Sequence, residues 1–340
     1  MATERSDVRS SSAEIDIHAA KLTKQFGDQY AVKDVSFDIP RGKIFGFIGP
    51  SGSGKTTAVR LLTGIYPPTA GTARVLGVEP MNFTQHLREE IGYMPQLFAL
   101  YPDLTVWENL NFVASLYGMN FVTRRKRLRE LLEFVELDKD RRKLARSISG
   151  GMQRRLTLAA TLAHDPRLLF LDEPTAGIDP VLRRKFWDHF KTLQDSGRTL
   201  FVTTQYVGEA AYCDYVGVMT RGQLVLVETP QGLRKRAYGG ELVDIVFKDS
   251  VSERRHLQPL QQFDFVQKQL PRAVQRTGRH NARIVVDDAG AALPALMKWF
   301  GDQEIEIENI EEHVPPFDDV FVEIVSKAEA EMDAAEANHG

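Results

Sequence analysis

Cysteine is nearly absent from this chain, because Cys213 is the one cysteine among 340 residues. A single cysteine excludes an internal disulfide framework, and it fits a reducing compartment or an inert buried thiol equally well. A surplus of positive charge is also missing, since 43 Lys and Arg residues stand against 46 Asp and Glu residues, a formal net charge of -3. This balance argues against a general nucleic-acid binder.

Long apolar runs are missing as well. No segment approaches the ~20 apolar residues of a membrane-spanning helix, because charged residues interrupt each candidate within a few positions. The first thirteen residues are polar, lack the apolar run of a secretory signal, and are expected to form a disordered tail. The sequence therefore predicts a soluble chain, or one that a partner holds at a membrane.

The length suggests two domains, since 340 residues exceed what one small core organises. Composition changes after "TRGQLVLVETPQGLRKRAYGG", where the pair Gly239-Gly240 marks a natural boundary. We expect a first domain over residues 14–238 and a smaller second domain over residues 241–326.

A glycine-rich turn joins an apolar strand to an apolar-periodic helix in "KIFGFIGPSGSGKTTAVRLLTG". The turn satisfies G-x-x-x-x-G-K-[ST], in which backbone N–H groups and a helix amino terminus face one phosphate. Lys55 can reach the β and γ phosphates of a nucleotide, and the Thr56 hydroxyl can ligate Mg²⁺. The expected nucleotide-contacting residues of this turn are Gly49, Pro50, Ser51, Gly52, Ser53, Gly54, Lys55, Thr56 and Thr57.

Two adjacent carboxylates end a second apolar strand, in "RLLFLDEPTAGIDP". Burying Asp172 and Glu173 at the end of a core strand is costly unless a cation or a substrate uses them. Beside a phosphate loop, Asp172 is well placed to hold Mg²⁺, and Glu173 to polarise a water for attack on the γ-phosphate. An isolated acidic pair of this kind would be equally compatible with a purely structural role.

A third segment, "SISGGMQRRLTLAATLA", places Ser149 as the N-cap of a helix, with Gly150 and Gly151 leaving the following amides unobstructed. A helix amino terminus of this kind suits an anion. By itself the pattern is weak, because most capped amphipathic helices with two glycines are simply helices.

The order and separation of these motifs resemble the nucleotide-binding subunit of an ABC transporter. The resemblance covers residues 15 to about 235 and rests on the phosphate loop, "YMPQ", "SISGGMQ", "LFLDEP" and "AGID". It implies an α/β P-loop NTPase fold, ATP and Mg²⁺ as ligands, and two ATP molecules sandwiched between two subunits, with Ser149, Gly150, Gly151 and Gln153 facing the nucleotide of the other copy. A homodimer, or a heterodimer, must then form.

The same resemblance implies roles for residues outside the three segments. Phe26 in "KQFG" would stack on adenine, although an ordinary core or surface aromatic remains an alternative. Gln96 would contact Mg²⁺ and the attacking water and sense the transport subunit. Asp179 would lie in a loop that crosses the dimer interface, although Pro180 directly after it also suits a plain helix N-cap. Gln205 occupies the place where the family normally carries a histidine that hydrogen-bonds the γ-phosphate.

Between Gln96 and Ser149 the sequence predicts helices, which the resemblance identifies as the helical subdomain over about residues 97–148. Thr105 is expected to cap the first of them. The basic run from Arg124 to Arg129 could be taken for a phosphate-binding patch, but it is better explained as the solvated face of a helix.

The remainder of the chain alternates as strand 241–247, helix 252–263, strand 264–270, strand 282–288, helix 291–300 and strand 304–310. This βαββαβ order is the ferredoxin-like α+β pattern. The unit contains no cluster of His, Cys or paired carboxylates, so an accessory or regulatory role is expected. The Ala/Glu-rich residues 327–340 are expected to fray as a flexible tail.

The ending "PPFDDVFVEIV" resembles the closing segment of ABC ATPases that serve ABC-2 type exporters of drugs, antibiotics and lipids. We therefore expect an exporter ATPase that hydrolyses ATP at the cytoplasmic face of the membrane, with ABC-2 type permease subunits as partners and no nucleic acid. An importer ATPase with a regulatory C-terminal domain is the alternative. A non-transport ABC ATPase acting on ribosomes or DNA would need features such as a second cassette or zinc cysteines.

Overall fold

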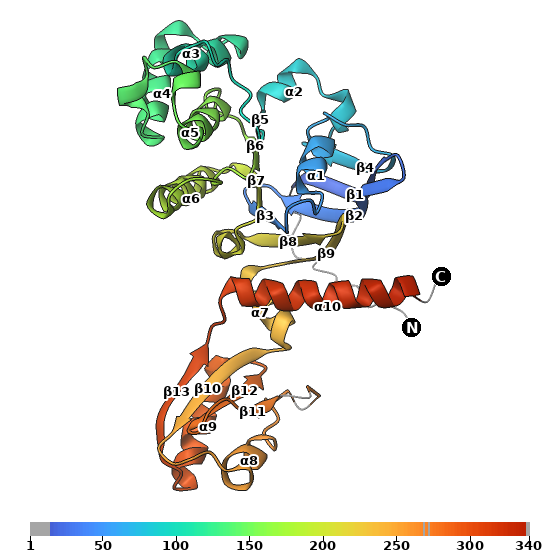
Figure 1. Ribbon diagram of the computed structural model, residues 1–340, viewed down its shortest axis with the longest axis vertical. Coiled ribbons are helices and arrows are strands. Elements are labelled where there is room, and N and C mark those ends of the chain that lie inside the picture. Colours follow the sequence, from blue (N-terminus) through green and yellow to red (C-terminus); the bar gives the residue numbers. More distant parts are fainter. Residues whose placement is uncertain (1–13, 268, 271–272, 338–340) are drawn as a thin grey trace. The chain divides into compact units, whose positions relative to one another are not determined.

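The computed structural model describes residues 14–267, 269–270 and 273–337 (Figure 1). The chain forms two compact units, Met1–Val227 and Glu228–Gly340, and each is considered by itself. The expected disordered tail over residues 1–13 lies outside the described residues. Within the described ranges, no helix combines the length and the apolar content needed to cross a bilayer.

A six-stranded sheet in the order β5-β6-β7-β3-β8-β9 forms the centre of the first unit. The pairs β5/β6, β6/β7, β7/β3 and β3/β8 are parallel. Every residue of β3, β6 and β7 is buried, as expected of parallel strands covered on both faces. The strands are β3 Ile44–Ile48, β5 Ile91–Met94, β6 Leu168–Asp172, β7 Thr199–Thr204, β8 Tyr215–Thr220 and β9 Gln223–Glu228.

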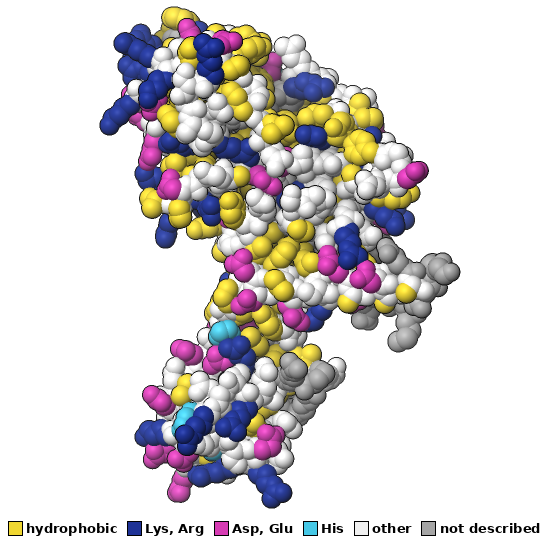
Figure 2. Space-filling view, in the orientation of Figure 1, with side chains coloured by type: hydrophobic (Ala, Val, Ile, Leu, Met, Phe, Trp, Pro, Cys, Tyr) yellow, Lys and Arg dark blue, Asp and Glu magenta, His cyan; other side chains and the backbone are white. Residues whose placement is uncertain are grey.

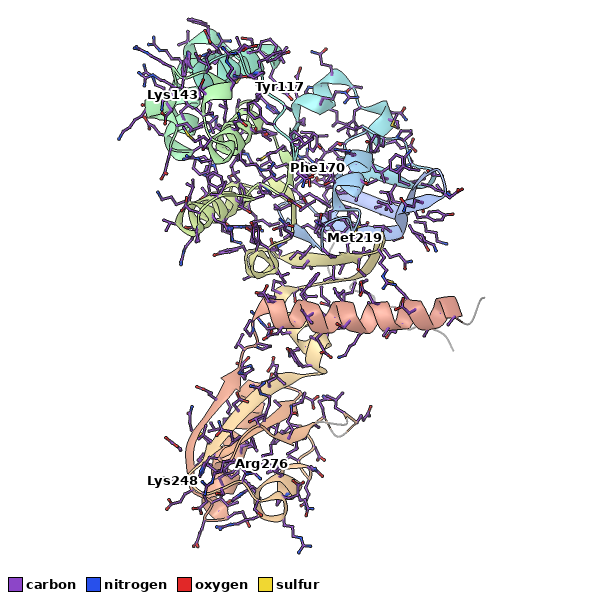
Figure 3. The ribbon with its side chains drawn as sticks, in the orientation of Figure 1. Tyr117, Lys143, Phe170, Met219, Lys248 and Arg276 are labelled. Atoms are coloured by element: carbon purple, nitrogen blue, oxygen red, sulfur yellow. The ribbon has the colours of Figure 1, made fainter. Side chains whose placement is uncertain are left out.

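A second, antiparallel sheet packs on the first and has the order β2-β1-β4. Aromatic rings fill the space between the two sheets. The ring centroids of Phe37 and Phe45 lie 5.4 Å apart, and those of Phe45 and Phe201 lie 5.5 Å apart. Phe170, labelled in Figure 3, extends this cluster. The strands are β1 Ile15–Phe26, β2 Gln29–Pro40 and β4 Ala70–Val75.

Helices surround the central sheet, and α3, α4 and α5 gather at one end of the first unit (Figure 1). Thr105 caps α3 through a reciprocal capping box with Glu108, which confirms the expected helix start. The α-helices are α1 Lys55–Leu62, α2 Gln85–Glu89, α3 Val106–Leu116, α4 Phe121–Phe134, α5 Gly150–Thr161 and α6 Pro180–Asp195. The 3₁₀ turns are η1 Pro80–Asn82, η2 Asp138–Asp140, η3 Ala145–Ser147 and η4 Val207–Tyr212.

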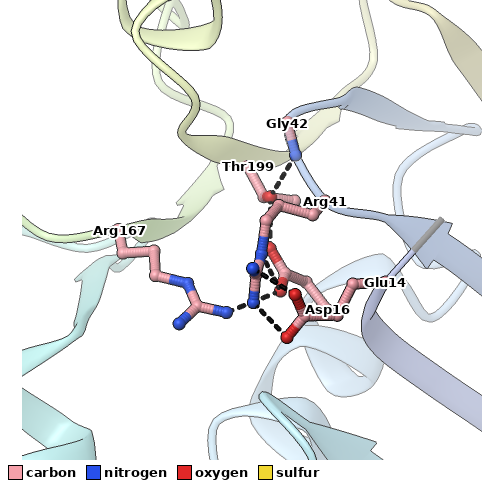
Figure 4. Close-up of polar contacts among 6 residues, drawn as sticks. All are labelled: Glu14, Asp16, Arg41, Gly42, Arg167 and Thr199. Atoms are coloured by element: carbon pink, nitrogen blue, oxygen red, sulfur yellow. Dashed lines mark hydrogen bonds and ion pairs between the residues drawn. The ribbon is translucent and has the colours of Figure 1, made fainter.

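A buried carboxylate, Asp16, joins both sheets where the central strands begin (Figure 4). Arg167 donates from Nη2 to Asp16 Oδ1 at 3.0 Å, and Arg41 from Nε to the same oxygen at 3.3 Å. The Thr199 hydroxyl donates to the other carboxylate oxygen and accepts the Gly42 amide at 2.8 Å. This network fixes the amino ends of β6 and β7 to β1, so the opposite edge of the sheet carries the strand ends available for chemistry.

The second unit contains an antiparallel sheet in the order β11-β12-β10-β13. Its buried face packs against α9, where Phe247 and Phe300 meet edge to face at 5.6 Å. The elements are α7 Pro230–Tyr238, β10 Glu241–Phe247, the π turn η5 Glu253–Leu257, α8 Gln258–Leu260, β11 Val274–Arg276, β12 Asn281–Val286, α9 Ala289–Asp302, β13 Ile307–His313 and α10 Phe317–Ala337.

The strand expected over residues 264–270 is wrong in its position. Within the described residues of this segment, Val266 forms one isolated bridge with Val286, and turn hydrogen bonds hold the backbone on either side. The edge strand is β11 instead. The helix expected over residues 252–263 is likewise reduced to a π turn and the short α8, where Pro259 supplies no backbone N–H.

Two expectations about the ends of the second unit also need correction. The boundary at Gly239-Gly240 is the end of α7, because Gly239 has φ 78° and caps that helix, and the compact units divide earlier, after Val227. The flexible tail expected over residues 327–340 is helical over residues 327–337, which continue α10, and residues 338–340 lie outside the described residues. Lys327 Nζ donates to the Ala237 carbonyl of α7 at 2.7 Å, and Ala328 is buried.

Candidate nucleotide site

The glycine-rich turn lies between β3 and α1, as the sequence predicts. Gly54 has φ 101°, and a Cβ there would lie 2.2 Å from the Ala31 carbonyl oxygen. A Cβ on Gly49 would lie 2.2 Å from the carbonyl oxygen of Met219, which Figure 3 labels. Both positions therefore require glycine, which lets the turn curl tightly between β3 and α1.

Lys55, the first residue of α1, folds back over the turn. Its Nζ donates to the Gly49 carbonyl at 2.7 Å and to the Pro50 carbonyl at 2.9 Å, and the side chain is buried. Burial lowers the pKa of Lys55, while the nearby carboxylates of Glu173 and Asp172 raise it. The ammonium is thus held at the mouth of the turn, within the field of both strand-end acids.

Asp172 and Thr56 supply the oxygens that a hard divalent cation needs. The Thr56 hydroxyl donates to Asp172 Oδ1 at 3.2 Å, and Thr203 donates to the same oxygen. The other oxygen, Asp172 Oδ2, is buried and has no hydrogen-bond partner within the described residues. A buried carboxylate oxygen without a donor is costly unless a cation uses it, so this set fits Mg²⁺ completed by phosphate and water oxygens.

The Ser53 hydroxyl, inside the same turn, is also buried and without a partner among the described residues. Its backbone amide donates to the Pro50 carbonyl at 3.2 Å. Unsatisfied buried hydroxyls are rare, and a phosphate oxygen would satisfy this one. Ser51, Gly52 and Thr57 lie in the same turn and first helical residues, as expected.

Glu173 and Gln96 meet beside Asp172. Gln96 Nε2 donates to Glu173 Oε2 at 3.3 Å, so the end of β5 and the end of β6 share a polar contact. Glu173 has φ 52°, a left-handed conformation that costs a non-glycine residue on the order of 1 kcal/mol. The backbone N–H of Glu173 donates to the Thr203 carbonyl and to the Thr203 hydroxyl, at 3.0 Å each, and these bonds hold the backbone in that conformation.

Arg154, on α5, is a residue of this site that the sequence did not single out. Its guanidinium donates to the backbone carbonyls of Gln96, Asp172 and Glu173, and lies 3.5 Å from that of Pro95. Burial lowers its pKa, and the carboxylates of Asp172 and Glu173 raise it. Its neighbour Arg155 has the same side chain, so the pattern "QRRL" gives no means of telling which arginine faces the site.

The loop after Gln96 is anchored by a fully buried amide. Asn109 Oδ1 accepts the Tyr101 amide at 2.8 Å. Its Nδ2 lies within hydrogen-bonding distance of three carbonyls, those of Tyr101, Thr105 and Leu104, at 2.9, 3.0 and 3.2 Å. The start of α3 is thereby fixed to the loop that carries Gln96.

The residues expected to face a second copy lie apart from this cluster. Ser149 caps α5 by accepting the Met152 amide at 3.3 Å, and Gly150 has open space around it. In the described part of the chain, no hydrogen bond joins residues 149–151 to the phosphate loop. Gln153 Nε2 donates to the Ala145 carbonyl at 2.9 Å, so its side chain is engaged within its own subunit.

Three further expected residues have distinct surroundings. Phe26 is 47 % exposed, meets Tyr66 edge to face with ring centroids 5.5 Å apart, and has the Lys24 ammonium 5.2 Å from its ring centroid. Asp179 caps α6 by accepting the amides of Val181 and Leu182. Gln205 follows β7 directly and is exposed, with no hydrogen bond among the described residues. Their roles toward a nucleotide remain predictions.

Comparison with known proteins identifies the family. The family model described as "ABC transporter" matches residues 32–176. The chain is 37 % identical over 249 residues to the probable multidrug ABC transporter ATP-binding protein YbhF of Escherichia coli, covering 73 % of this chain and 43 % of that protein. It is 38 % identical to the Nod factor export ATP-binding protein I of Ralstonia nicotianae, covering 70 % of this chain and 75 % of that protein. The chain belongs to the ABC transporter ATP-binding proteins.

The fold of the first unit agrees with this assignment. A dimeric post-hydrolysis state of the ATP-binding cassette MJ0796 bound to ADP and Pi matches with a TM-score of 0.58 and 28 % identity, over 63 % of this chain and 98 % of that one. The chain therefore carries an ABC ATPase domain, which confirms the predicted P-loop fold and ATP as a ligand. It spans less than half the length of YbhF.

Proposed function

We propose that this chain is the ATPase subunit of an ABC exporter. The observation that carries the proposal is the convergence of Lys55, Thr56, Asp172, Glu173 and Gln96 at one sheet edge, with a buried carboxylate oxygen left without a donor. Phosphoryl transfer depends mainly on positioning and charge stabilisation, and this set supplies both.

Each residue has a separate task in this mechanism. Lys55 and the amides of residues 49–56 bind the β and γ phosphates of ATP. Thr56, Asp172 and Gln96 would hold Mg²⁺, which would supply positive charge to neutralise the phosphates of ATP. Glu173 accepts a proton from the attacking water, and its contact with Gln96 orients the carboxylate.

The site is completed by a second copy. Ser149, Gly150 and Gly151 lie at the amino terminus of α5, where unobstructed amides suit an anion. Because no hydrogen bond joins them to their own phosphate loop among the described residues, we place them against the ATP of a partner subunit, in a homodimer. Phe26 stacks on adenine and Asp179 lies at the dimer interface.

The partners follow from the relatives and from the closing segment of the sequence. Relatives named for multidrug transport and for Nod factor export favour export over the alternative of import. We place the chain at the cytoplasmic face of the membrane, bound to ABC-2 type permease subunits, with no role for nucleic acid.

The second unit is proposed to be a ferredoxin-like accessory domain. The sheet order β11-β12-β10-β13, antiparallel throughout, supports this interpretation, with β11 in place of the strand expected over residues 264–270.

Replacing Glu173 with Gln tests the mechanism. The amide keeps the shape of the side chain but cannot accept the proton, so Glu173→Gln should accumulate as an ATP-bound dimer when ATP and Mg²⁺ are present. Size-exclusion chromatography with and without nucleotide measures the shift. A variant that hydrolyses ATP at the normal rate and stays monomeric with ATP would contradict the role given to Glu173.

A further inference from the structure

Five arginines surround one open cavity in the helical part of the first unit. The cavity has a volume of about 530 Å³ and is formed by the start of α3, the first turns of α4 and the segment after η2. Figure 2 shows dark blue side chains gathered over α3 and α4. We call this cluster the arginine basin; its members are Arg124, Arg125, Arg129, Arg141 and Arg142.

Most of this positive charge is not neutralised locally. Arg141 is paired with Asp138 at 2.8 Å. The side chains of Arg125, Arg129 and Arg142 form no hydrogen bond or ion pair with any described residue, and all three residues are exposed. Glu108, the one carboxylate among the described residues that line the cavity, is engaged in the capping box of α3. The basin is thus strongly positive although the whole chain has a formal charge of -3.

Large apolar side chains stand exposed at the edge of the basin. Phe121 and Val122, in the first turn of α4, are 77 % and 81 % exposed. Phe121 lines the cavity, and Arg124 lies over its ring at 5.2 Å. Trp107 lines the cavity from α3. The surface therefore offers free guanidinium groups and apolar contacts together.

We propose that the arginine basin, with Phe121 and Val122, binds the phosphate headgroups of anionic phospholipids. Guanidinium groups pair with phosphate oxygens in a two-point geometry, and aromatic side chains favour the boundary between headgroups and acyl chains. A soluble phosphate ester would satisfy the arginines but would leave the exposed apolar side chains in water. The inference rests on the proposed function only for the location of the chain beside a membrane.

Vesicle binding by the full-length chain tests the proposal. Sedimentation with vesicles of phosphatidylcholine mixed with phosphatidylglycerol should retain the protein, and vesicles of phosphatidylcholine alone should not. Arg129→Glu combined with Arg142→Glu should weaken retention by at least about 30-fold, since the loss of each arginine near an anionic surface costs about 1 kcal/mol and the two added carboxylates are repelled by that surface. The matched control reverses the exposed pair Arg254 and Arg255 of the second unit to Glu and should leave retention unchanged.

Two further measurements distinguish a phospholipid headgroup from a soluble phosphate ester as the bound group. Phe121→Ser should weaken vesicle binding although all five arginines keep their charge, and soluble glycerol phosphate should not displace the protein. Three results would each overturn the proposal. The protein could be retained equally on neutral and acidic vesicles, or the control pair could weaken retention as much as the basin variants do. Glycerol phosphate could also displace the protein while Phe121→Ser has no effect. ATP hydrolysis by the basin variants should stay normal, so failure here is distinguishable from failure of the ATPase assignment.

Discussion

The guanidinium of Arg154 donates to the backbone carbonyl of Gln96, and so connects α5 to the loop that follows β5. The same group donates to the carbonyls of Asp172 and Glu173. One side chain therefore holds the backbones of two segments, the loop after β5 and the end of β6, whose side chains meet at the nucleotide site. Because all these partners are backbone carbonyls, Arg154 acts through other residues and is a positioning residue.

Replacing Arg154 with Leu should lower kcat roughly 10- to 100-fold and change ATP affinity little, because it loosens the catalytic geometry while leaving the phosphate loop intact. Arg154→Lys should recover only part of the rate, since an ammonium cannot span several carbonyls. Steady-state ATPase assays with separate kcat and KM values measure this. Arg155→Leu is the control on the same helix, because Arg155 donates to Val135. If Arg154→Leu lowers kcat no more than Arg155→Leu does, the positioning role of Arg154 is wrong.

Gln205 should support ATP hydrolysis without a histidine. A glutamine amide can donate to a phosphate oxygen, although it cannot carry a positive charge or shuttle a proton near neutral pH. On our interpretation Glu173 and Mg²⁺ carry catalysis, so Gln205→His should leave the ATP turnover rate within a few-fold, and Gln205→Ala should lower it more. A tenfold or greater increase in Gln205→His would show instead that the natural protein is a slow ATPase.

His189 should make the first unit sensitive to acid. Burial, together with Arg127 and Arg198, lowers its pKa to about 4, and its ring stacks on Phe134 at 3.9 Å. The unfolded state therefore binds a proton at a higher pH than the folded state does. As a result, the free energy of unfolding decreases as the pH falls from about 6.5 toward 4. Between pH 7 and pH 5 the loss is about 2 kcal/mol.

Urea unfolding of His189→Gln at the two pH values checks this prediction. The variant should lose less stability than the natural chain between pH 7 and pH 5, whatever its stability at pH 7. An unchanged difference between the two pH values would show that His189 does not titrate as its surroundings imply.

The second unit should be dispensable for nucleotide binding. The phosphate loop, Asp172 and Gln96 all belong to the first unit. A chain that ends at Glu228 keeps β9 whole and should bind ATP within about threefold of the full chain, a difference below about 0.7 kcal/mol. Titration calorimetry measures the affinity, and circular dichroism verifies folding. Complete loss of binding by a folded truncated chain would show that the second unit completes the site.

Short sequence patterns were enough to predict those parts of the site that lie within one contiguous segment of the chain. The strand, turn and helix from Ile44 to Leu62 are contiguous, and two of the glycines in the turn are required by close approach to other backbone. Asp172 and Glu173 follow a run of apolar residues that predicts a buried strand end. Arg154 and Asn109 could not be found in this way. The side chain of Arg154 donates to carbonyls that are far away in the sequence, and that of Asn109 donates to carbonyls of an irregular loop.

The second unit shows where local patterns mislead. Phe265 and Val266 gave residues 264–270 the appearance of a strand, but Phe265 stacks on Phe263 at 4.9 Å and the backbone turns there. The composition of the Ala/Glu-rich end of the chain predicts fraying, yet α10 continues through it, because Ala and Glu are strong helix formers and Lys327 and Ala328 contact the rest of the unit.

The loop between Gln96 and Tyr101 is pinned at both ends, by Arg154 and by Asn109. The five Cα–Cα steps from Gln96 to Tyr101 can extend over at most about 18 Å. Any displacement of Gln96 that exceeds the reach of this short segment must therefore also move Tyr101 and, through Asn109, the start of α3.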